Sequence, residues 1–413
     1  MSSWRRTYWS VWIANLVTSI GMMSFLPFFP SLLEEMGVAD ETAKRAWAGA
    51  IFGAAPLSAT VMSPIWGAIG DRVGRKLMVC RAMLAITVFV GGMYFVHTPW
   101  GLLLLRLGQG LFSGFIPPSI TLVSIAAPPA RQGRVAGDLT TALALGAILG
   151  PALGGWMASW TGEHRTVFLI VGACSLVSAG LVAGLAQEDP SQRLSRAPDP
   201  ADAPRRTVRA ALRDIRRDIV TVIANPVLRG AAGVVFALQF SLGSINPVLE
   251  LHARELVAGT GMDTDLATSL LFSAMGVCNL LALPFWGRYG DRVGHRRALV
   301  LCAGGCVLAL GLQAAATVYA FLLVGRLAMG VAMAGTGPLA FGLAAGEISA
   351  QRRGGAFGVV FSARTLAVAV GGISGGALSA VIGVRGLMLA SGLLLLSAVL
   401  AFRRQPASSA STP

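Results

Sequence analysis

The stretch Gly67-Ala-Ile-Gly70-Asp71-Arg72-Val73-Gly74-Arg75-Lys76 returns 220 positions later as Gly287-Arg-Tyr-Gly290-Asp291-Arg292-Val293-Gly294-His295-Arg296. At the same offset, Pro27 falls on Pro247, Trp66 on Trp286 and Arg106 on Arg326. Chance can give one such match, but not an ordered series along most of a chain. The sequence therefore predicts two copies of one ancestral unit.

Composition places both copies in a membrane. Of the 413 residues, 54% are hydrophobic and only 13% are charged, whereas a soluble domain has about 25% charged residues. A spanning helix needs about 20 mostly apolar residues, and the apolar runs between charged breaks predict twelve such helices. They cover residues 11–33, 47–69, 77–97, 100–124, 136–161, 166–186, 229–250, 266–287, 297–316, 318–344, 355–382 and 384–402. We expect an all-α membrane protein with twelve transmembrane helices in two pseudo-symmetric six-helix bundles.

The longest polar break divides the chain into domains. We expect an N-terminal six-helix bundle over residues 1–186, a linker over 187–228, a C-terminal six-helix bundle over 229–402 and a tail over 403–413. Apolar residues recur at helical spacing within the linker, at Val208, Leu212, Ile215, Ile219 and Val222. This spacing predicts an amphipathic helix lying on the membrane surface.

Charge sets the orientation. Most of the 33 Lys and Arg residues lie in the termini and the even-numbered loops, and the first odd-numbered loop is acidic. Basic loops stay on the cytoplasmic side of a membrane, so both termini and the linker are expected there. The net charge of +14 follows from these loops, and we expect no nucleic-acid partner.

Three motifs carry a resemblance to a known family. The loop from Pro64 and Trp66 to Lys76 resembles the signature between the second and third helices of the major facilitator superfamily. Arg106-Leu-Gly-Gln109-Gly110 is similar to the helix-4 motif of that family. The fifth run resembles the helix-5 motif of its drug/proton antiporters, through Gly146, Gly150, Pro151, Gly154 and Gly155. The likeness is greatest to bacterial multidrug efflux members and covers nearly all of the chain except the linker and the tail.

The resemblance implies a latch that locks the two halves while the cavity faces outward. Its residues here are Gly67, Gly70, Asp71, Arg72, Gly74, Arg75, Asp291 and Arg292. Glycines allow a tight turn, and Asp71 can accept hydrogen bonds from a helix N-terminus. A basic loop that only sets topology is the alternative. Because His295 stands where the first copy has Arg75, we expect the second latch to be weaker or sensitive to pH.

A second set of residues is expected to line the path of substrate and protons, namely Arg106, Gln109, Arg326, Arg364, Asp138, Phe240, Gln239 and Asn246. A cation in hydrocarbon costs at least about 2.5–3.5 kcal/mol. Arg364 lies about 13 Å along its span, near mid-membrane, and is a functional candidate. A structural brace on backbone carbonyls is the alternative for Arg106 and Arg364, and Arg326, with Met329 in place of Gln109, is expected to be structural.

The spans have three arginines but no carboxylate near their midpoints. Asp138, Asp71 and Glu34 are therefore the candidates for the proton-carrying group, and the sequence does not decide between them. We hypothesise that a cavity with net positive charge prefers anionic or zwitterionic amphiphiles.

The predicted function is export of small amphiphilic molecules or drugs in exchange for protons, by alternating access in a bacterial inner membrane. The glycine strip and Pro151 favour export over import, although an ordinary small-residue interface is the alternative interpretation. Proton-coupled uptake or efflux of a specific metabolite, such as a sugar or an organic anion, is the alternative function.

We expect no enzyme activity, metal or cofactor, because no ligand cluster or nucleophile motif is present and the four histidines fall in predicted loops. Small-molecule substrate, protons and lipids are the expected partners of a monomer.

Overall fold

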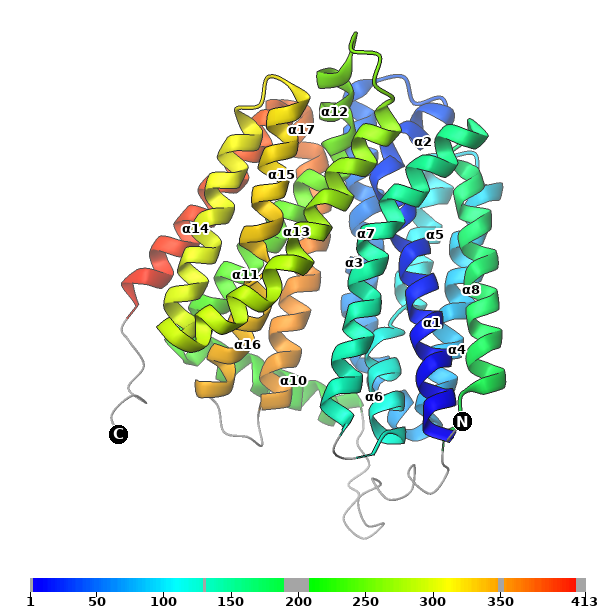
Figure 1. The fold of residues 1–413 in the computed structure, drawn as a ribbon, viewed down its shortest axis with the longest axis vertical. Coiled ribbons are helices and arrows are strands. Elements are labelled where there is room, and N and C mark those ends of the chain that lie inside the picture. The colour runs from blue at the N-terminus through cyan, green and yellow to red at the C-terminus, as the bar shows by residue number, and fades with distance from the viewer. Residues whose placement is uncertain (1–2, 129–130, 189–207, 348–352, 406–413) are drawn as a thin grey trace. The chain divides into compact units, whose positions relative to one another are not determined.

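The computed structural model describes residues 3–128, 131–188, 208–347 and 353–405, and the elements in these ranges are helices (Figure 1). Eleven of the described helical stretches are long and apolar enough to cross a membrane. The last of them lies in α17 (Arg353–Arg404), where Gly383 has φ 72° and joins two helices across a kink. These two helices, 353–382 and 384–404, are spans 11 and 12, so the predicted all-α fold with twelve spans is confirmed.

Six spans make up the first copy of the repeat. Span 1 is α1 (Ser3–Ser24), the turn η1 (Leu26–Phe28) and α2 (Phe29–Glu35); span 2 is α3 (Glu41–Val73); span 3 is α4 (Arg75–Gly92) with η2 (Met93–Phe95); span 4 is α5 (Pro99–Phe112) and α6 (Ile116–Ala126); span 5 is α7 (Gln132–Thr161); span 6 is α8 (Arg165–Leu185).

The second copy follows an extra helix, α10 (Val208–Ala224), in the stretch whose spacing predicts an amphipathic helix. Span 7 is α11 (Pro226–Ile245), the turn η4 (Asn246–Val248) and α12 (Leu249–Val257); span 8 is α13 (Thr264–Val293); span 9 is α14 (His295–Ala314); span 10 is α15 (Tyr319–Met333) and α16 (Thr336–Glu347).

The two copies break their helices at equivalent places. Spans 1 and 7 both pass through a 3₁₀ turn that contains a proline, Pro27 in η1 and Pro247 in η4. Proline lacks the N–H that a continuing α-helix needs, so the repeated residue gives the repeated break. Spans 3 and 9 begin after Gly74 and Gly294, whose φ values of 108° and 90° suit glycine alone.

Two spans are less continuous than the apolar runs predict. Span 4 was expected to run unbroken over 100–124, but α5 ends at Phe112 and α6 begins at Ile116. Gly114 between them has φ 106°, a conformation outside the helical range that ends α5. Span 10 is also interrupted, between Met333 and Thr336, although Ala334 there keeps helical backbone angles. Hydropathy does not report such breaks, because the residues on both sides are equally apolar.

Contacts divide the chain into two compact units. One comprises Met1–Leu32 and Ala54–Ala211, and the other comprises Leu33–Gly53 and Leu212–Pro413. The first part of α3, up to Gly53, therefore belongs with the C-terminal spans.

In the first unit, the predicted glycine strip of α7 packs directly on α1. A methyl group added to Gly146 would collide with Ser19, and one on Gly154 would collide with the backbone carbonyl of Ser24. A Cβ atom on Gly150 would lie 2.6 Å from the Cβ atom of Met23, which is closer than two carbons can approach. Small residues thus bring the two backbones together, as in other membrane helix pairs.

In the second unit, span 11 uses glycines on two faces. Gly371 and Gly375 pack against α11, where an added methyl group would collide with Phe240 or Ser244. Gly376 faces α3, and a Cβ atom on Gly49 would lie 2.6 Å from its Cα atom. Span 11 is therefore in close backbone contact with both of its neighbours in this unit.

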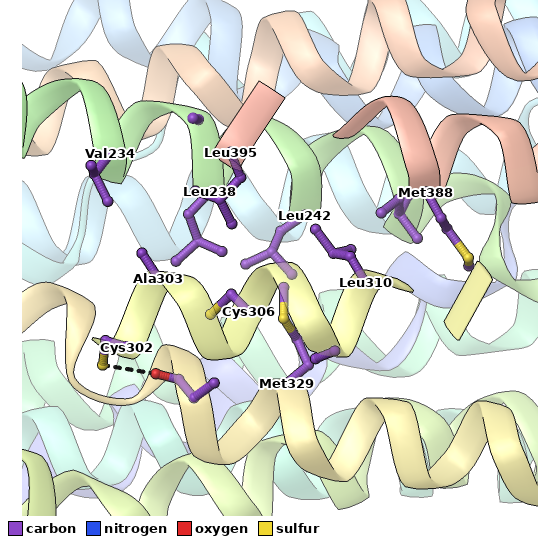
Figure 2. Packing of buried hydrophobic residues seen from close by; sticks show 14 of the residues in the cluster. Val234, Leu238, Leu242, Cys302, Ala303, Cys306, Leu310, Met329, Met388 and Leu395 are labelled. Carbon is purple, nitrogen blue, oxygen red and sulfur yellow. Dashed lines mark hydrogen bonds between the residues drawn. The ribbon is translucent and has the colours of Figure 1, made fainter. Parts of the chain in front are cut away.

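The core of the second unit is apolar and closely packed. Leu238 and Leu242 of α11 lie against Cys306 and Leu310 of α14 (Figure 2). Cys302 is fully buried beside them, and its thiol donates to the carbonyl of Ala332 at 2.9 Å. These cysteines are core residues, as their apolar sequence surroundings predict.

The α7–α1 contact can be tested with two alanine substitutions on the same helix. Gly154→Ala should lower the free energy of unfolding by about 1–3 kcal/mol, because the methyl group has no space beside Ser24. Gly137→Ala is the matched control, since nothing lies within 4 Å of that position and alanine favours the helix by up to about 1 kcal/mol. Thermal unfolding of the purified protein in detergent measures both. Equal effects of the two substitutions would show that the contact does not hold α7 on α1.

Candidate functional site

Arg106 is enclosed by span 1 and by its own helix. It lies on α5 with 3% of its surface exposed, and its Nη1 donates to Oε1 of Gln109 at 2.6 Å. The guanidinium carbon lies 5.7 Å from the ring centre of Phe25 and 5.5 Å from that of Phe29. Ring faces attract cations most strongly where water is excluded. Arg106 and Gln109, both predicted site residues, are therefore in direct contact, and aromatic residues of span 1 cover them.

Arg326 is equally buried in the second copy, but its acceptor comes from another span. Its Nη2 donates to Oδ1 of Asn246 at 3.0 Å, and its guanidinium carbon lies 5.0 Å from the ring centre of Phe272. Asn246 sits in the turn η4, so the break in span 7 supplies the oxygen that Met329 cannot. The sequence pattern missed this pairing because the two residues are 80 positions apart.

Arg364 lines a cavity inside the second unit. The cavity has a volume of about 180 Å³ and is formed by α11, α13, α16, α17 and the α15–α16 connection. The lining residues are Val235, Gln239, Asn279, Leu283, Met333, Ala334, Thr336, Gly337, Pro338, Ala340, Phe341, Val360 and Arg364. Among these described residues Arg364 alone is charged. The predicted residues Gln239 and Arg364 are thus brought together.

The remaining predicted cavity residues lie elsewhere. Phe240 stacks on Phe236 with ring centres 6.4 Å apart, and neither ring is among those lining the Arg364 cavity. Two polar lining residues, Asn279 and Thr336, were not predicted. Asn279 stands alone in the apolar run of span 8, which is a signal that a search for isolated intramembrane amides could have used.

Asp138 lies near the start of α7 and contacts α1. Its Oδ2 accepts a hydrogen bond from the hydroxyl of Tyr8 at 3.2 Å, and its backbone carbonyl accepts one from the indole of Trp12 at 3.0 Å. The side chain is half-buried. Among the predicted proton carriers, Asp138 therefore combines partial burial with a hydrogen bond to a neutral group.

The start of span 3 is bound by a carboxylate from outside the latch motif. Glu188, at the end of span 6, accepts hydrogen bonds from the backbone N–H groups of Arg75 at 2.8 Å and Lys76 at 3.2 Å. The N-terminus of α4 thereby gains a negative charge where the helix dipole favours one. Asp71, which the sequence suggested for a contact of this kind, has its side chain outside the described residues, as does Arg72.

The other latch residues follow the repeat only in part. Gly70 packs against Met78, and its repeat copy Gly290 packs against Leu339. Gly67 has nothing within 4 Å of an added Cβ atom. His295, which replaces Arg75, lies with Nε2 3.7 Å from Oδ1 of Asp291.

Charged residues gather around α12 in the second unit. Arg254 pairs with Glu34 at 2.6 Å and with the fully buried Glu250 at 3.1 Å. His252 is also fully buried, with Nδ1 3.3 Å from Glu255. The prediction that all histidines lie in loops is wrong for His252, because span 7 continues as a helix to Val257 beyond its predicted end at residue 250. It is also wrong for His295, which is the first residue of α14.

Comparison with known proteins agrees with this architecture. The family model of the Major Facilitator Superfamily matches residues 11–262 and 231–413. This chain belongs to that superfamily. It is a multi-pass membrane transporter and not an enzyme.

Two named relatives are a multidrug resistance protein and a multi-drug resistance efflux pump. The chain is 30% identical to the multidrug resistance protein MdtG of Escherichia coli over 399 residues, covering 96% of this chain and 94% of that protein. It is 31% identical to the multi-drug resistance efflux pump PmrA of Streptococcus pneumoniae over 300 residues, covering 72% and 70%. The resemblance to multidrug efflux members of the superfamily is therefore confirmed.

Solved structures share the fold. The nucleoside transporter NupG has a TM-score of 0.77 at 13% identity, covering 96% of this chain and 98% of that one. A D-xylose–proton symporter has a TM-score of 0.75 at 18% identity, covering all of both chains. At such low identity the likeness concerns the fold alone.

The contact between Arg106 and Gln109 gives one prediction. Gln109→Met makes the first copy like the second and removes the oxygen that Arg106 contacts at 2.6 Å. Hydrogen bonds to charged groups contribute about 1.5–3 kcal/mol, so the unfolding temperature of the purified protein should fall. Gln109→Glu keeps an acceptor at the same place and is the control. A methionine variant as stable as the glutamate variant would show that Arg106 depends on other contacts.

The Glu188 cap gives another prediction. Glu188→Gln should destabilise the protein by about 0.3–1 kcal/mol, because it removes the charge at the N-terminus of α4. Glu163→Gln, in the exposed connection between spans 5 and 6, removes a charge without removing such a cap. Unfolding in low and high salt compares the two, since the dipole contribution is screened by salt. Identical behaviour of both variants would contradict the assigned role.

Proposed function

We propose that this transporter exports small amphiphilic molecules from the cytoplasm in exchange for protons, by alternating access. The observation that carries the proposal is span 5, where Gly146, Gly150 and Gly154 pack α7 tightly on α1 around the helix-interior Pro151. Spans 11 and 7 repeat the glycine contact through Gly371 and Gly375, but without a proline. This asymmetry is the one that the antiporter resemblance implies.

The relatives support the direction of transport. Both named pumps are described by efflux or drug resistance, and the match to MdtG extends along almost the whole chain. Uptake of one metabolite is the other candidate, and the nucleoside and xylose transporters share only the fold with this chain. Their likeness therefore does not favour uptake.

Two residues of the first unit, Arg106 and Asp138, support the proposed proton exchange. Arg106 is an intramembrane cation whose Nη1 donates to the neutral amide of Gln109 and whose guanidinium group lies beside the rings of Phe25 and Phe29, and an ionisable residue inside a membrane is a functional candidate by default. Asp138 is a half-buried carboxylate whose present partner, Tyr8, is neutral. A carboxylate in such surroundings can take up and release a proton without first breaking an ion pair with that partner.

The proposed setting is the bacterial inner membrane, with both termini in the cytoplasm. The excess of Lys and Arg in the even-numbered loops supports this orientation. The basic helix α10 then lies on the cytoplasmic side, in contact with lipid headgroups.

The proton step can be tested in vesicles with an imposed pH gradient. Asp138→Asn should reduce gradient-driven accumulation of an exported dye at least about tenfold, because the amide cannot carry a proton. Dye exchange without a gradient should continue, since that reaction needs no net proton movement. Asp263→Asn is the control, because Asp263 caps α13 by accepting from Leu266 and asparagine caps equally well. Loss of exchange together with accumulation would make Asp138 a structural residue.

A further inference from the structure

The three arginines near the midpoints of the spans, Arg106, Arg326 and Arg364, differ in their partners. Arg106 donates to Gln109, and Arg326 donates to Asn246. Arg364 has neither a hydrogen-bond acceptor nor an ion-pair partner among the side chains and backbone groups that the structure describes. Its side chain is exposed to the cavity that it lines. An intramembrane cation without a partner costs about 2.5–3.5 kcal/mol on insertion scales and about 10–17 kcal/mol in simulations of an isolated helix, so this position calls for a ligand.

A second unpartnered polar group faces the same cavity. Gln239 of α11 is 6% exposed, lines the cavity, and has no hydrogen-bond partner among the described residues. Its amide atoms are not among the fully buried unpartnered atoms of the described residues, so they are accessible from the cavity. The neighbouring hydroxyl of Thr336 already donates to the carbonyl of Met333 at 2.7 Å. Arg364 and Gln239 are therefore the donors that the cavity leaves free.

The rest of the lining defines what can enter. Leu283, Met333, Phe341 and Val360 give it apolar walls, and no aspartate or glutamate is among the described lining residues. A cationic group would meet the charge of Arg364 without a compensating acid. An anionic oxygen would gain charge-assisted hydrogen bonds, which are about twice as strong as neutral ones.

The volume limits the size of that ligand. Sites for whole drug-sized molecules have about 300–1,000 Å³, and this cavity has about 180 Å³. It can hold one carboxylate or sulfonate and the few carbons attached to it. The remainder of an amphiphile must lie outside this cavity.

We propose that Arg364 and Gln239 form an anion subsite, which makes the transporter select amphiphiles with a carboxylate or sulfonate group. The proposal rests on the proposed export function for its biological meaning, but the binding of an anion to this cavity stands separately. Arg364 holds the anionic oxygens in a two-pronged contact, and the amide N–H group of Gln239 donates to one of them. The arginine geometry suits a planar carboxylate better than a lysine does.

Two dyes of the same ring system separate the charge from the shape of the ligand. Fluorescein is anionic, whereas an esterified rhodamine is a cation on the same xanthene scaffold. Fluorescence anisotropy with the full-length purified protein measures the dissociation constant of each. Arg364→Gln should weaken fluorescein binding at least about tenfold, the equivalent of one charge-assisted hydrogen bond. Rhodamine binding should change much less, so that the preference for the anion is lost.

Three further variants complete the test. Arg364→Lys should bind fluorescein more tightly than Arg364→Gln but less tightly than the unmodified protein. Lysine keeps the positive charge but cannot make the two parallel hydrogen bonds of a guanidinium group. Gln239→Leu should weaken fluorescein binding by a smaller factor. Arg403→Gln removes a positive charge from the exposed end of span 12 and should leave both affinities as they are. Thermal unfolding of each variant shows that it is folded.

The outcomes distinguish the subsite from the export function. Equal weakening of both dyes in folded Arg364→Gln, or no weakening, would overturn the subsite, as would a wild-type protein that binds rhodamine but not fluorescein. Arg364-dependent binding of fluorescein in a protein that moves neither dye under a pH gradient would leave the subsite standing and refute proton-driven export.

Discussion

Close backbone contact through glycine is the constraint on which the described structure depends. Between two helices in lipid the hydrophobic effect gives little driving force, because lipid tails are as apolar as leucine side chains. Packing must instead come from short-range contacts, which grow when side chains are small. Span 5 meets span 1 through Gly150 and Gly154, and span 11 meets span 7 through Gly371 and Gly375. The same solution appears once in each copy, at equivalent positions, and in the second copy it holds span 11, the helix that carries Arg364.

The buried arginines of spans 4 and 10, Arg106 and Arg326, show how the two repeat copies have diverged. Each copy keeps an arginine in its fourth span, and each must satisfy that charge locally. The first copy uses Gln109 one turn further along the helix, and the second uses Asn246 from the turn in span 7. Once the second arginine has its acceptor in another span, methionine can occupy position 329. Both copies thus give the buried arginine an amide oxygen as acceptor, but the oxygen comes from the same helix in the first copy and from another span in the second.

The sequence predicted the repeat, the twelve spans and the helix contacts of the glycine strip, because each depends on residue type at a fixed spacing. It also named Arg364 and Gln239, since an isolated polar residue in an apolar run is visible without a structure. It did not show that these two share a cavity, or that Asn246 bonds to Arg326, because such pairings depend on how distant spans turn about their axes. The Glu188 cap was missed for a related reason. A glutamate in a polar segment after span 6 looks like any other solvated charge until the fold places it at the start of α4.

The two glycine faces of span 11 have an evolutionary consequence. Gly371 and Gly375 contact α11, while Gly372 and Gly376 contact the part of α3 near Gly49, so two adjacent faces of this helix have no space for a larger side chain. Arg364 occupies the same helix, beyond the end of that crowded segment. We therefore expect substitutions that change the range of compounds to be tolerated at the Arg364 end of this helix and on the spans facing it, and not within the glycine segment.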